Sequence, residues 1–420
     1  MTIIGNKVLR IGPALTEGIR QQSIALAATG QLERLVTSWC FTEKTHSVIR
    51  ALPVGRSVTK RRPSPVDSRL LIRVPIADVY HSVTHWLGGG SVDASDRFHA
   101  AVDRAASCWV KPPVNMVLGR EDACLSSFQK ARELGITRLY DLPTAYFRTV
   151  QKLLDQELAQ FPDVDPVTTD PREYASDRAE RKENELALAD QILCPSSFVR
   201  QSLLDAGVDA SKIHCIPHAA IQEWLDIPVP EHRPPIFLFV GQISLRKGAH
   251  RLLQVWKKIK AYRTHRLRLI GPMRLTDTFL RDYAGLYEHV PSLPRHALPK
   301  EYAQARALVL NSSSEGLAMV ILEAISCGTP VLASRNTGGE DILSDGIEGR
   351  FFDFGDDDAL MAALDWGLSH PQELAEMGRR ARLRAALWTW REYRNHFMQW
   401  IAQQGHHAHQ RMRATPTIRP

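Results

Sequence analysis

Residues 314–330 read SEGLAMVILEAISCGTP, and this stretch decides the fold class of the 420-residue chain. Two carboxylates, Glu315 and Glu323, lie eight positions apart in an apolar run that has the composition of a buried helix. Gly-Thr-Pro then ends the run before a short expected strand at 331–334. A helix that begins near Leu317 would turn its unpaired N–H groups and positive dipole end toward the loop of Glu315, which makes an anion site.

The spacing of the two carboxylates indicates what such a site holds. Eight residues of helix rise by about 12 Å, at about 1.5 Å per residue. That span suits a ligand with a hydroxylated sugar at each end and a diphosphate between them. The stretch therefore predicts a nucleotide-sugar site.

Three motifs carry a family resemblance. The pattern Glu-Gly-x5-Leu-Glu-Ala-x3-Gly-x-Pro at 315–330 resembles the signature of the family 4 retaining glycosyltransferases. IFLFVGQISLRKG at 236–248 resembles their donor loop, and NTGGEDILSDG at 336–346 resembles their next loop. The resemblance runs from about residue 183 to about residue 393. It implies the GT-B fold, an α/β fold of two Rossmann-like, doubly wound parallel-sheet domains that face a cleft.

Composition is consistent with this fold. Hydrophobic residues make up 44% of the chain and charged residues 24%, as in ordinary soluble proteins. No apolar stretch approaches the roughly 18 residues of a membrane span, and the first residues lack the pattern of a signal peptide. The six cysteines are scattered, with no Cys-x-x-Cys pair. We therefore expect a cytoplasmic protein with reduced thiols.

Basic residues exceed acidic ones, with 53 against 46 and a net charge of +7. They gather at 60–62, at 379–384 and in the last ten residues. One interpretation is peripheral contact with an anionic membrane that carries a lipid-linked acceptor; the other is a solvated basic face without a partner. Nucleic acid is not expected as a partner, because no aromatic-plus-basic motif or zinc-finger spacing occurs.

Alternating strand and helix patterns divide the chain into two α/β halves. Expected strands include 8–11, 35–40, 236–240, 267–270 and 307–310. The predicted units are an N-terminal domain on the acceptor side at 1–218, a linker at 219–235 and a donor-binding domain at 236–385. A helix at 386–403 is expected to return to the N-terminal domain, and a disordered basic tail is expected at 404–420.

The resemblance assigns the chemistry of the donor side. Lys247 and Arg246 would neutralise the leaving diphosphate, Glu315 would lie beside the transferred sugar, and Glu323 would bind the ribose hydroxyls. Lys247 and Glu315 are thus the expected catalytic residues. The other expected donor-binding residues are Gly241, Ser244, Gly316, Leu317, Ala318, Met319 and Val320, partly through backbone N–H groups.

Structural alternatives stand beside these roles. Lys247 and Arg246 could form a solvated charge pair, Glu315 could serve the helix dipole, and Glu323 could be a salt-bridged helix residue. No metal or cofactor is expected, since cations and N–H groups neutralise the diphosphate. Asp356 and its two acidic neighbours precede an expected helix and fit helix capping better than metal binding.

On the acceptor side, Asp141, at the end of an expected strand, and Gly12, after the first strand, are the expected residues. The predicted function is transfer of a sugar from a nucleotide-diphosphate donor to a glycan or lipid-linked acceptor, in the synthesis of cell-surface polysaccharide. A GT-B nucleotide-sugar 2-epimerase and a non-catalytic sugar-nucleotide-binding protein remain as alternatives.

Overall fold

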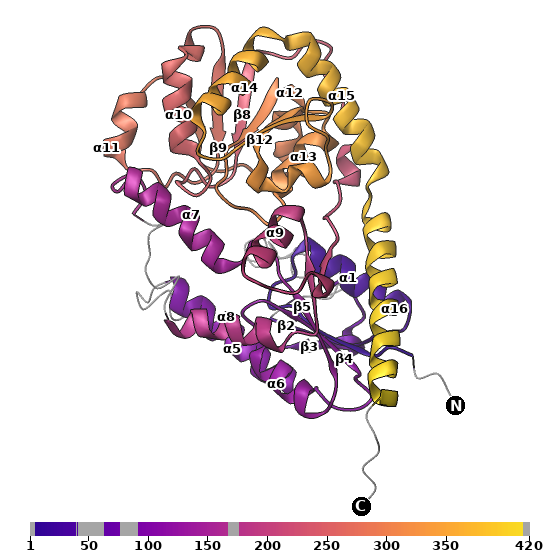
Figure 1. Ribbon diagram of the computed structural model, residues 1–420. Helices are drawn as coiled ribbons and strands as arrows, with labels where there is room; N and C mark the ends of the chain where they lie inside the picture. Colours follow the sequence, from indigo (N-terminus) through magenta and orange to yellow (C-terminus); the bar gives the residue numbers. More distant parts are fainter. Residues whose placement is uncertain (1–4, 39, 41–62, 76–90, 167–175, 415–420) are drawn as a thin grey trace, which may run out of the picture.

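The computed structural model describes residues 5–38, 40, 63–75, 91–166 and 176–414. These residues form two α/β domains, one above the other in Figure 1. The basic run at 60–62 lies outside the described residues.

The N-terminal sheet has seven parallel strands in the order β3-β2-β1-β4-β5-β6-β7. The chain winds outward from β1 through β2 to β3, then returns to the other side of β1 with β4. Loops after β1 and β4 therefore flank the point where the winding reverses, which is where open α/β sheets bind ligands. The strands are β1 Val8–Ile11, β2 Leu32–Thr37, β3 Leu71–Arg73, β4 Met116–Arg120, β5 Thr137–Asp141, β6 Gln191–Cys194 and β7 Ile213–Cys215.

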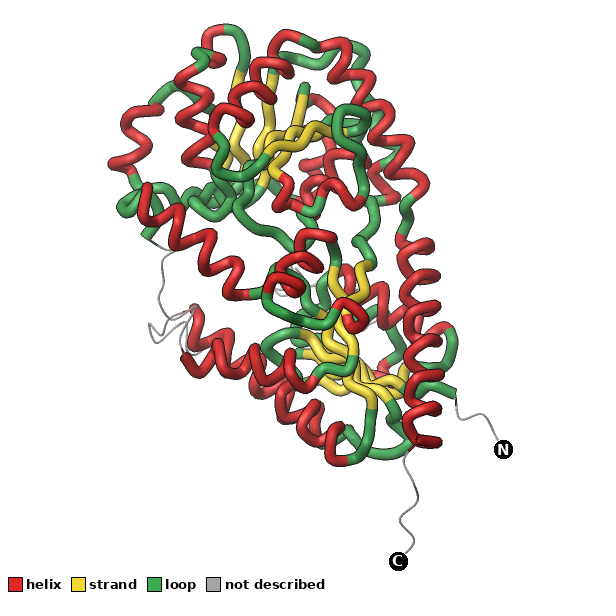
Figure 2. The backbone as a smooth tube through the Cα atoms, in the orientation of Figure 1, coloured by secondary structure: helices red, strands yellow, loops and turns green. Residues whose placement is uncertain are grey.

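Helices cover this sheet because strands of a parallel sheet are apolar on both faces. They are α1 Glu17–Ala28, α5 Ser91–Ser107, α6 Leu125–Glu133, α8 Ser176–Leu188 and α9 Ser197–Asp205. Helix α7 Phe147–Gln160 packs instead on the C-terminal domain, where Arg251 donates to Glu157 at 2.8 Å. Figure 2 shows α9 between the two sheets, at the junction of the domains.

The C-terminal sheet has six parallel strands in the order β10-β9-β8-β11-β12-β13. They are β8 Ile236–Val240, β9 Arg266–Ile270, β10 Glu288–Val290, β11 Ala307–Leu310, β12 Val331–Ser334 and β13 Gly349–Phe352. Helices α10 Ala249–Lys258, α11 Asp277–Leu280, α12 Leu298–Gln304, α13 Met319–Ser326, α14 Asp357–Ser369 and α15 Pro371–Leu387 accompany them. Phe237, Phe239 and Trp256 are fully buried in the core. Here the winding reverses between β8 and β11.

Two of the described connections run from one domain to the other. The first passage follows β7 and leads to β8; the second joins α15 to α16, Trp390–Ala414. Helix α16 lies along the N-terminal domain in Figure 1, where Gln22 of α1 donates to the hydroxyl of Tyr393 at 2.9 Å. The indole of Trp388, between the two helices, donates to the carbonyl of His218 at 3.0 Å. Both passages are thus tied together beside the N-terminal sheet.

Three expectations for local structure need correction. The strand expected at 35–40 spans Leu32–Thr37, because Leu32 pairs with Val8 and Ser38 turns back to donate to Pro13. Helix α13 begins at Met319, two residues after Leu317, because Ala318 has extended backbone angles and is the N-cap.

The third correction concerns the tail expected to be disordered from 404. Helix α16 continues to Ala414, and Gln404 is buried at its inner face. In the part of the chain that the structure describes, no helix combines the length and the apolar character needed to cross a bilayer.

Candidate active site

The loops that carry two of the sequence motifs follow β8 and β11, neighbours in the sheet. Both loops leave the carboxyl ends of their strands where the winding reverses, which is the expected place for a ligand. Gly248, with φ 66°, closes the first loop, and a Cβ on it would lie 1.7 Å from the carbonyl oxygen of Asn311. Only glycine lets the loops approach this closely. The N–H of Ser313 then donates to the carbonyl of Arg246 at 2.8 Å.

Lys247 and Glu315 meet between these loops. The Lys247 ammonium forms an ion pair with Oε1 of Glu315, and Arg246 Nη1 lies 3.9 Å from the same oxygen. The side chains of Lys247 and Glu315 are only 15% and 12% exposed. Burial alone would raise the pKa of Glu315, but the charges of Lys247 and Arg246 outweigh it and lower that pKa. Glu315 is therefore a carboxylate at neutral pH.

Other expected residues of the donor loop support this pair. Ser244 is buried and its Oγ accepts from the N–H of Lys247 at 3.3 Å. The N–H of Gly241, the residue that follows β8, donates to the carbonyl of Ile270 at 2.9 Å. Arg246 donates to the carbonyl of Ser314 at 3.0 Å. The loop is thus held in one shape before any ligand arrives.

Glu323 lies on α13, one turn into the helix, and is 7% exposed. It accepts from the Tyr302 hydroxyl of α12 at 2.8 Å and from Arg295 Nη1 at 3.3 Å. Burial raises the pKa of Glu323, and the Tyr302 hydrogen bond and Arg295 only partly offset this rise. Sequence reasoning missed Tyr302 and Arg295, because no spacing in the chain links them to Glu323.

The backbone between the two carboxylates is less open than expected. Leu317 and Ala318 are buried, and the N–H of Ala318 already donates to Thr337. It is therefore occupied in this arrangement and is not offered to a ligand. Met319 and Val320 begin α13 and present the positive end of its dipole. The N–H of Glu315 donates to Asn336 at 3.0 Å, so the third sequence motif adjoins the same site.

The donor loops touch the N-terminal domain at Gly316. Its carbonyl accepts a hydrogen bond from the hydroxyl of Ser196, and a Cβ on Gly316 would lie 1.8 Å from the carbonyl oxygen of Pro143. Nearby, Asp341 accepts from the N–H of Ser197 at 2.9 Å, at the start of α9. The two domains are thus in direct contact beside Glu315.

The two residues expected on the acceptor side lie in the N-terminal sheet. Asp141, at the end of β5, is buried and forms ion pairs with Arg10 and, at 3.2 Å, with Arg120. Although burial opposes ionisation, these two arginines lower its pKa. Gly12 donates to Val36 at 2.9 Å, directly after β1. The carboxylate of Asp141 is therefore engaged inside the protein.

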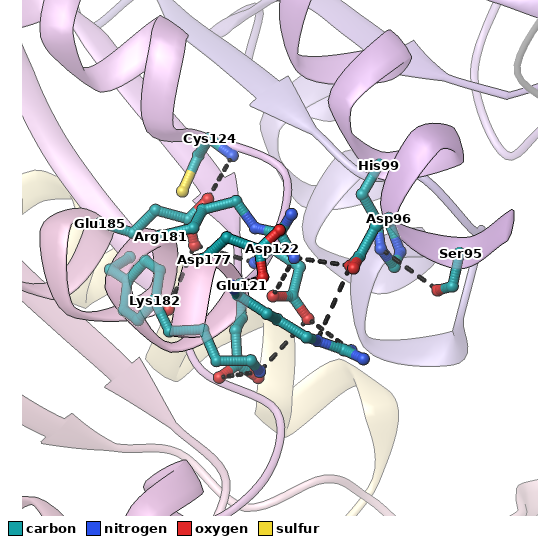
Figure 3. A network of polar contacts seen from close by, with 12 residues as sticks. Ser95, Asp96, His99, Glu121, Asp122, Cys124, Asp177, Arg181, Lys182 and Glu185 are labelled. Atoms are coloured by element: carbon teal, nitrogen blue, oxygen red, sulfur yellow. Dashed lines mark hydrogen bonds and ion pairs between the residues drawn. The ribbon is translucent and has the colours of Figure 1, made fainter. Parts of the chain in front are cut away.

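A polar network after β4 escaped sequence reasoning (Figure 3). Lys182 of α8 lies 2.8 Å from Glu121, and Arg181 lies 3.0 Å from Asp122. Asp122 has φ 72°, an unusual value for a residue other than glycine. The N–H of Asp122 donates a hydrogen bond to the carboxylate of Glu185 at 2.8 Å. Burial raises the pKa of Glu185 to about 8. The only sequence signal is the charge-rich run at 180–185, which predicts no more than a helix.

Among the described residues, no group of three or more His, Cys, Asp or Glu side chains is arranged to hold a metal ion. Asp356 caps α14, as its side chain accepts from the N–H of Ala359 at 2.8 Å. This contact fits the capping role expected from the sequence.

Comparison with known proteins finds a family whose model matches the part of the chain that carries this site. The model of the family "Glycosyl transferases group 1" matches residues 221–384, which include Lys247, Glu315 and Glu323. A D-inositol 3-phosphate glycosyltransferase from Xylanimonas cellulosilytica is 28% identical over 206 residues, covering 43% of this chain and 47% of that protein. The chain thus spans about half the length of this curated relative.

Solved structures match nearly the whole chain. Sucrose-phosphate synthase from Thermosynechococcus elongatus covers 95% of this chain, and the match covers 99% of that chain, with a TM-score of 0.64 and 18% identity. The Anabaena protein HepE, solved in complex with UDP-glucose, has a TM-score of 0.59 and 12% identity. The match covers 95% of this chain and 100% of HepE. These likenesses concern the fold, two facing α/β domains. Residues 221–384 thus match the glycosyl transferases group 1 family, and the chain has the GT-B fold.

Proposed function

We propose that the protein transfers a sugar, with retention of anomeric configuration, from a nucleotide-diphosphate donor to an acceptor hydroxyl. The observation that carries this proposal is the buried ion pair of Lys247 and Glu315 between the loops after β8 and β11. A cation suited to a diphosphate and a carboxylate suited to a developing positive charge are in contact. A sugar–phosphate bond bound against this pair would meet the cation at its phosphate end and the carboxylate at its sugar end.

The proposed reaction uses these two groups differently. Lys247 and Arg246 bind the diphosphate and stabilise the negative charge that grows as it leaves. The bond between the anomeric carbon and the phosphate oxygen breaks while the acceptor oxygen bonds to the same face of that carbon. The acceptor proton passes to the departing phosphate oxygen. Glu315, ionised, stabilises the positive charge on the sugar, and Glu323 binds the ribose.

We propose a glycan or lipid-linked acceptor, and synthesis of cell-surface polysaccharide on the cytoplasmic face of a membrane. The network after β4 supports an acceptor side in the N-terminal domain, because it stands where that sheet reverses its winding. Asp141 is paired with Arg10 and Arg120, and Glu121 and Asp122 are likewise paired with Lys182 and Arg181. The network therefore supports this region of the sheet and singles out none of the three carboxylates.

The test begins with the donor. UDP, GDP and dTDP and their sugars are screened for the nucleotide that raises the melting temperature, starting with UDP-glucose because HepE was solved with it. The selected donor is then incubated with membrane-lipid and oligosaccharide acceptors, and the product is analysed by NMR. A product with the donor's anomeric configuration supports the proposal. Release of nucleotide with an epimerised free sugar would identify an epimerase instead.

Lys247→Ala is expected to weaken nucleotide-diphosphate binding by roughly 10- to 100-fold, since a charge-assisted hydrogen bond contributes about 1.5–3 kcal/mol. Isothermal titration calorimetry measures the effect. Lys258→Ala is the control. Lys258 is a lysine of the same domain that is 62% exposed, and its ion pair with Asp358 is long, at 3.7 Å. Equal nucleotide affinity in both folded variants would contradict the role of Lys247.

Excess chelator is expected to leave transfer, or slow donor hydrolysis, essentially unchanged. The reason is that Lys247, Arg246 and backbone N–H groups neutralise the diphosphate without a divalent ion. The rate is measured before and after treatment with EDTA, with Mg²⁺ and Mn²⁺ added back. Complete loss of activity that only a divalent ion restores would show that these cations are insufficient.

A further inference from the structure

A cavity of about 710 Å³ lies at the opposite edge of the C-terminal sheet from Glu315. Its walls are residues 229–233 of the linker before β8, Arg306 before β11, Gly328 before β12, and the part of α15 at 371–382. All three strands begin at this edge, whereas the donor loops leave the carboxyl ends. The volume lies within the roughly 300–1,000 Å³ of small-molecule sites.

Positive charge dominates the wall of this cavity. Arg233, Arg306, Arg379 and Arg382 line it, against one carboxylate, the exposed Glu231. Arg379 has a carboxylate partner in Glu376, at 2.7 Å. Arg306 shares a contact of 2.8 Å with the ring of His265.

The two arginines nearest Gly328 donate hydrogen bonds to backbone carbonyls. Arg233 donates to the carbonyls of Gly328 at 2.6 Å and Ala305 at 3.2 Å, and Arg382 donates to the carbonyl of Leu225. Among the described residues, neither forms an ion pair with a carboxylate. Their charges are therefore not neutralised by the protein around them.

These two side chains also lie close to one another. A Cβ on Gly328 would be 3.4 Å from Cδ of Arg382 and 3.6 Å from Nη2 of Arg233. Burial, together with a smaller effect of the neighbouring charge of Arg382, lowers the pKa of Arg233 to about 10. Like charges held together in a partly dry place repel each other, so an anion between them would be stabilising.

The remaining walls indicate what accompanies the anion. Val229 and Pro230 of the linker are exposed apolar residues beside the arginines. Pro371 and Gln372 belong to the first turn of α15, whose positive dipole end adds to the attraction. A phosphate ester with a less polar body matches this combination of guanidinium groups, helix end and apolar wall.

We propose that this cavity is a second anion site, separate from the donor cleft, for a ligand bearing a phosphate or diphosphate group. The site adjoins both passages between the domains, since the linker forms one wall and α15 another. Helix α15 leads directly to Trp388, which donates to His218 in the N-terminal domain. A bound phosphate ester would therefore contact both the linker and α15, two of the segments that connect the domains. The basic run at 379–384 then has a specific role through Arg379 and Arg382.

The experiment measures binding of inorganic pyrophosphate by calorimetry in the Lys247→Ala protein, whose donor cleft binds diphosphate weakly if the proposed function is right. Arg382→Gln is expected to weaken pyrophosphate binding by roughly tenfold or more, as expected for a lost charge-assisted contact. Arg379→Gln is expected to weaken it less, because Arg379 is exposed. Arg380→Gln is the matched control: Arg380 lies on the same helix and shares the partner Glu376 at 2.7 Å, but does not line the cavity.

A second arm distinguishes a free phosphate ester from a lipid headgroup. Co-sedimentation compares vesicles of phosphatidylcholine alone with vesicles that also contain phosphatidic acid. Binding of either probe that depends on Arg382 or Arg379, and not on Arg380, supports the site and identifies its source.

Three outcomes would overturn the second site. The first is failure of both probes to bind. The second is binding in both Arg382→Gln and Arg379→Gln that is as strong as in the protein without these substitutions. The third is binding that Arg380→Gln reduces as much as Arg382→Gln does. Melting curves establish that each variant is folded, and the exposed Arg379 provides a test even if Arg382→Gln does not fold. If pyrophosphate binds parent and Lys247→Ala equally, the proposed donor role of Lys247 fails while the second site stands.

Discussion

Glu315→Gln is expected to lower the turnover number by roughly 100- to 1,000-fold, the range seen when one preorganised electrostatic group is removed from an active site. The substitution keeps the size of the side chain and much of its hydrogen bonding. It removes the negative charge that stabilises the sugar only while the glycosidic bond breaks. Because this charge acts mainly in the transition state, affinity for the donor should change far less than the rate.

The ion pair with Lys247 adds a second expectation for this variant. Loss of the carboxylate frees the ammonium to interact fully with a diphosphate. Free nucleotide diphosphate should therefore bind Glu315→Gln at least as well as the parent. Titrations with nucleotide and sugar-nucleotide, beside the turnover number, measure both effects. Normal turnover together with weakened nucleotide binding would show that the roles are assigned wrongly.

Glu323→Gln is the matched comparison, because it makes the same chemical change eight residues away. Ribose hydroxyls are the same in the ground and transition states, so nucleotide and sugar-nucleotide should both bind more weakly, by about tenfold for one charge-assisted contact. The ratio of the two affinities should stay constant. If neither Glu315→Gln nor Glu323→Gln changes binding or rate, the two carboxylates are structural.

Much of the fold follows from local sequence pattern. The strands at 8–11, 236–240 and 307–310 coincide with β1, β8 and β11, because each is a short apolar run with a clear break beside it. The placement of the Lys247 and Glu315 motifs after strand ends follows as well. What local pattern does not contain is the pairing of those two strands as neighbours, which is a property of the whole sheet.

Contacts between distant segments account for what the sequence left out. The hydroxyl of Tyr302 on α12 donates to Glu323 on α13. The carboxylate of Glu185 accepts from the N–H of Asp122, more than sixty residues away in the sequence. Asp141 was placed correctly at a strand end, but its pairing with Arg10 and Arg120 depends on strand order. The tail was expected to be disordered from 404, but α16 continues through it to Ala414. Its His- and Gln-rich composition does not indicate the helix face on which Gln404 is buried.

Gly316→Ala is expected to reduce turnover by roughly 100-fold, the loss that a displacement of about 1 Å in an active site can cause. The added methyl group would lie 1.8 Å from the carbonyl oxygen of Pro143 and 2.9 Å from its carbonyl carbon. Both are backbone atoms that cannot rotate away, so the two domains must separate or the loop must shift. The N–H of residue 316 and the Lys247–Glu315 pair remain, and nucleotide affinity should change by only a few-fold.

Small-angle X-ray scattering beside kinetics separates this effect from a chemical one. If the methyl group forces the domains apart, the radius of gyration of Gly316→Ala should exceed that of the parent. Ser196→Ala removes only the hydroxyl that donates to Gly316, so its loss of turnover should be smaller than that of Gly316→Ala. Gly5→Ala is the control, because a Cβ there meets nothing within 4 Å. Parental turnover and parental scattering in Gly316→Ala would contradict the inference that contact between the domains beside Glu315 is required for catalysis.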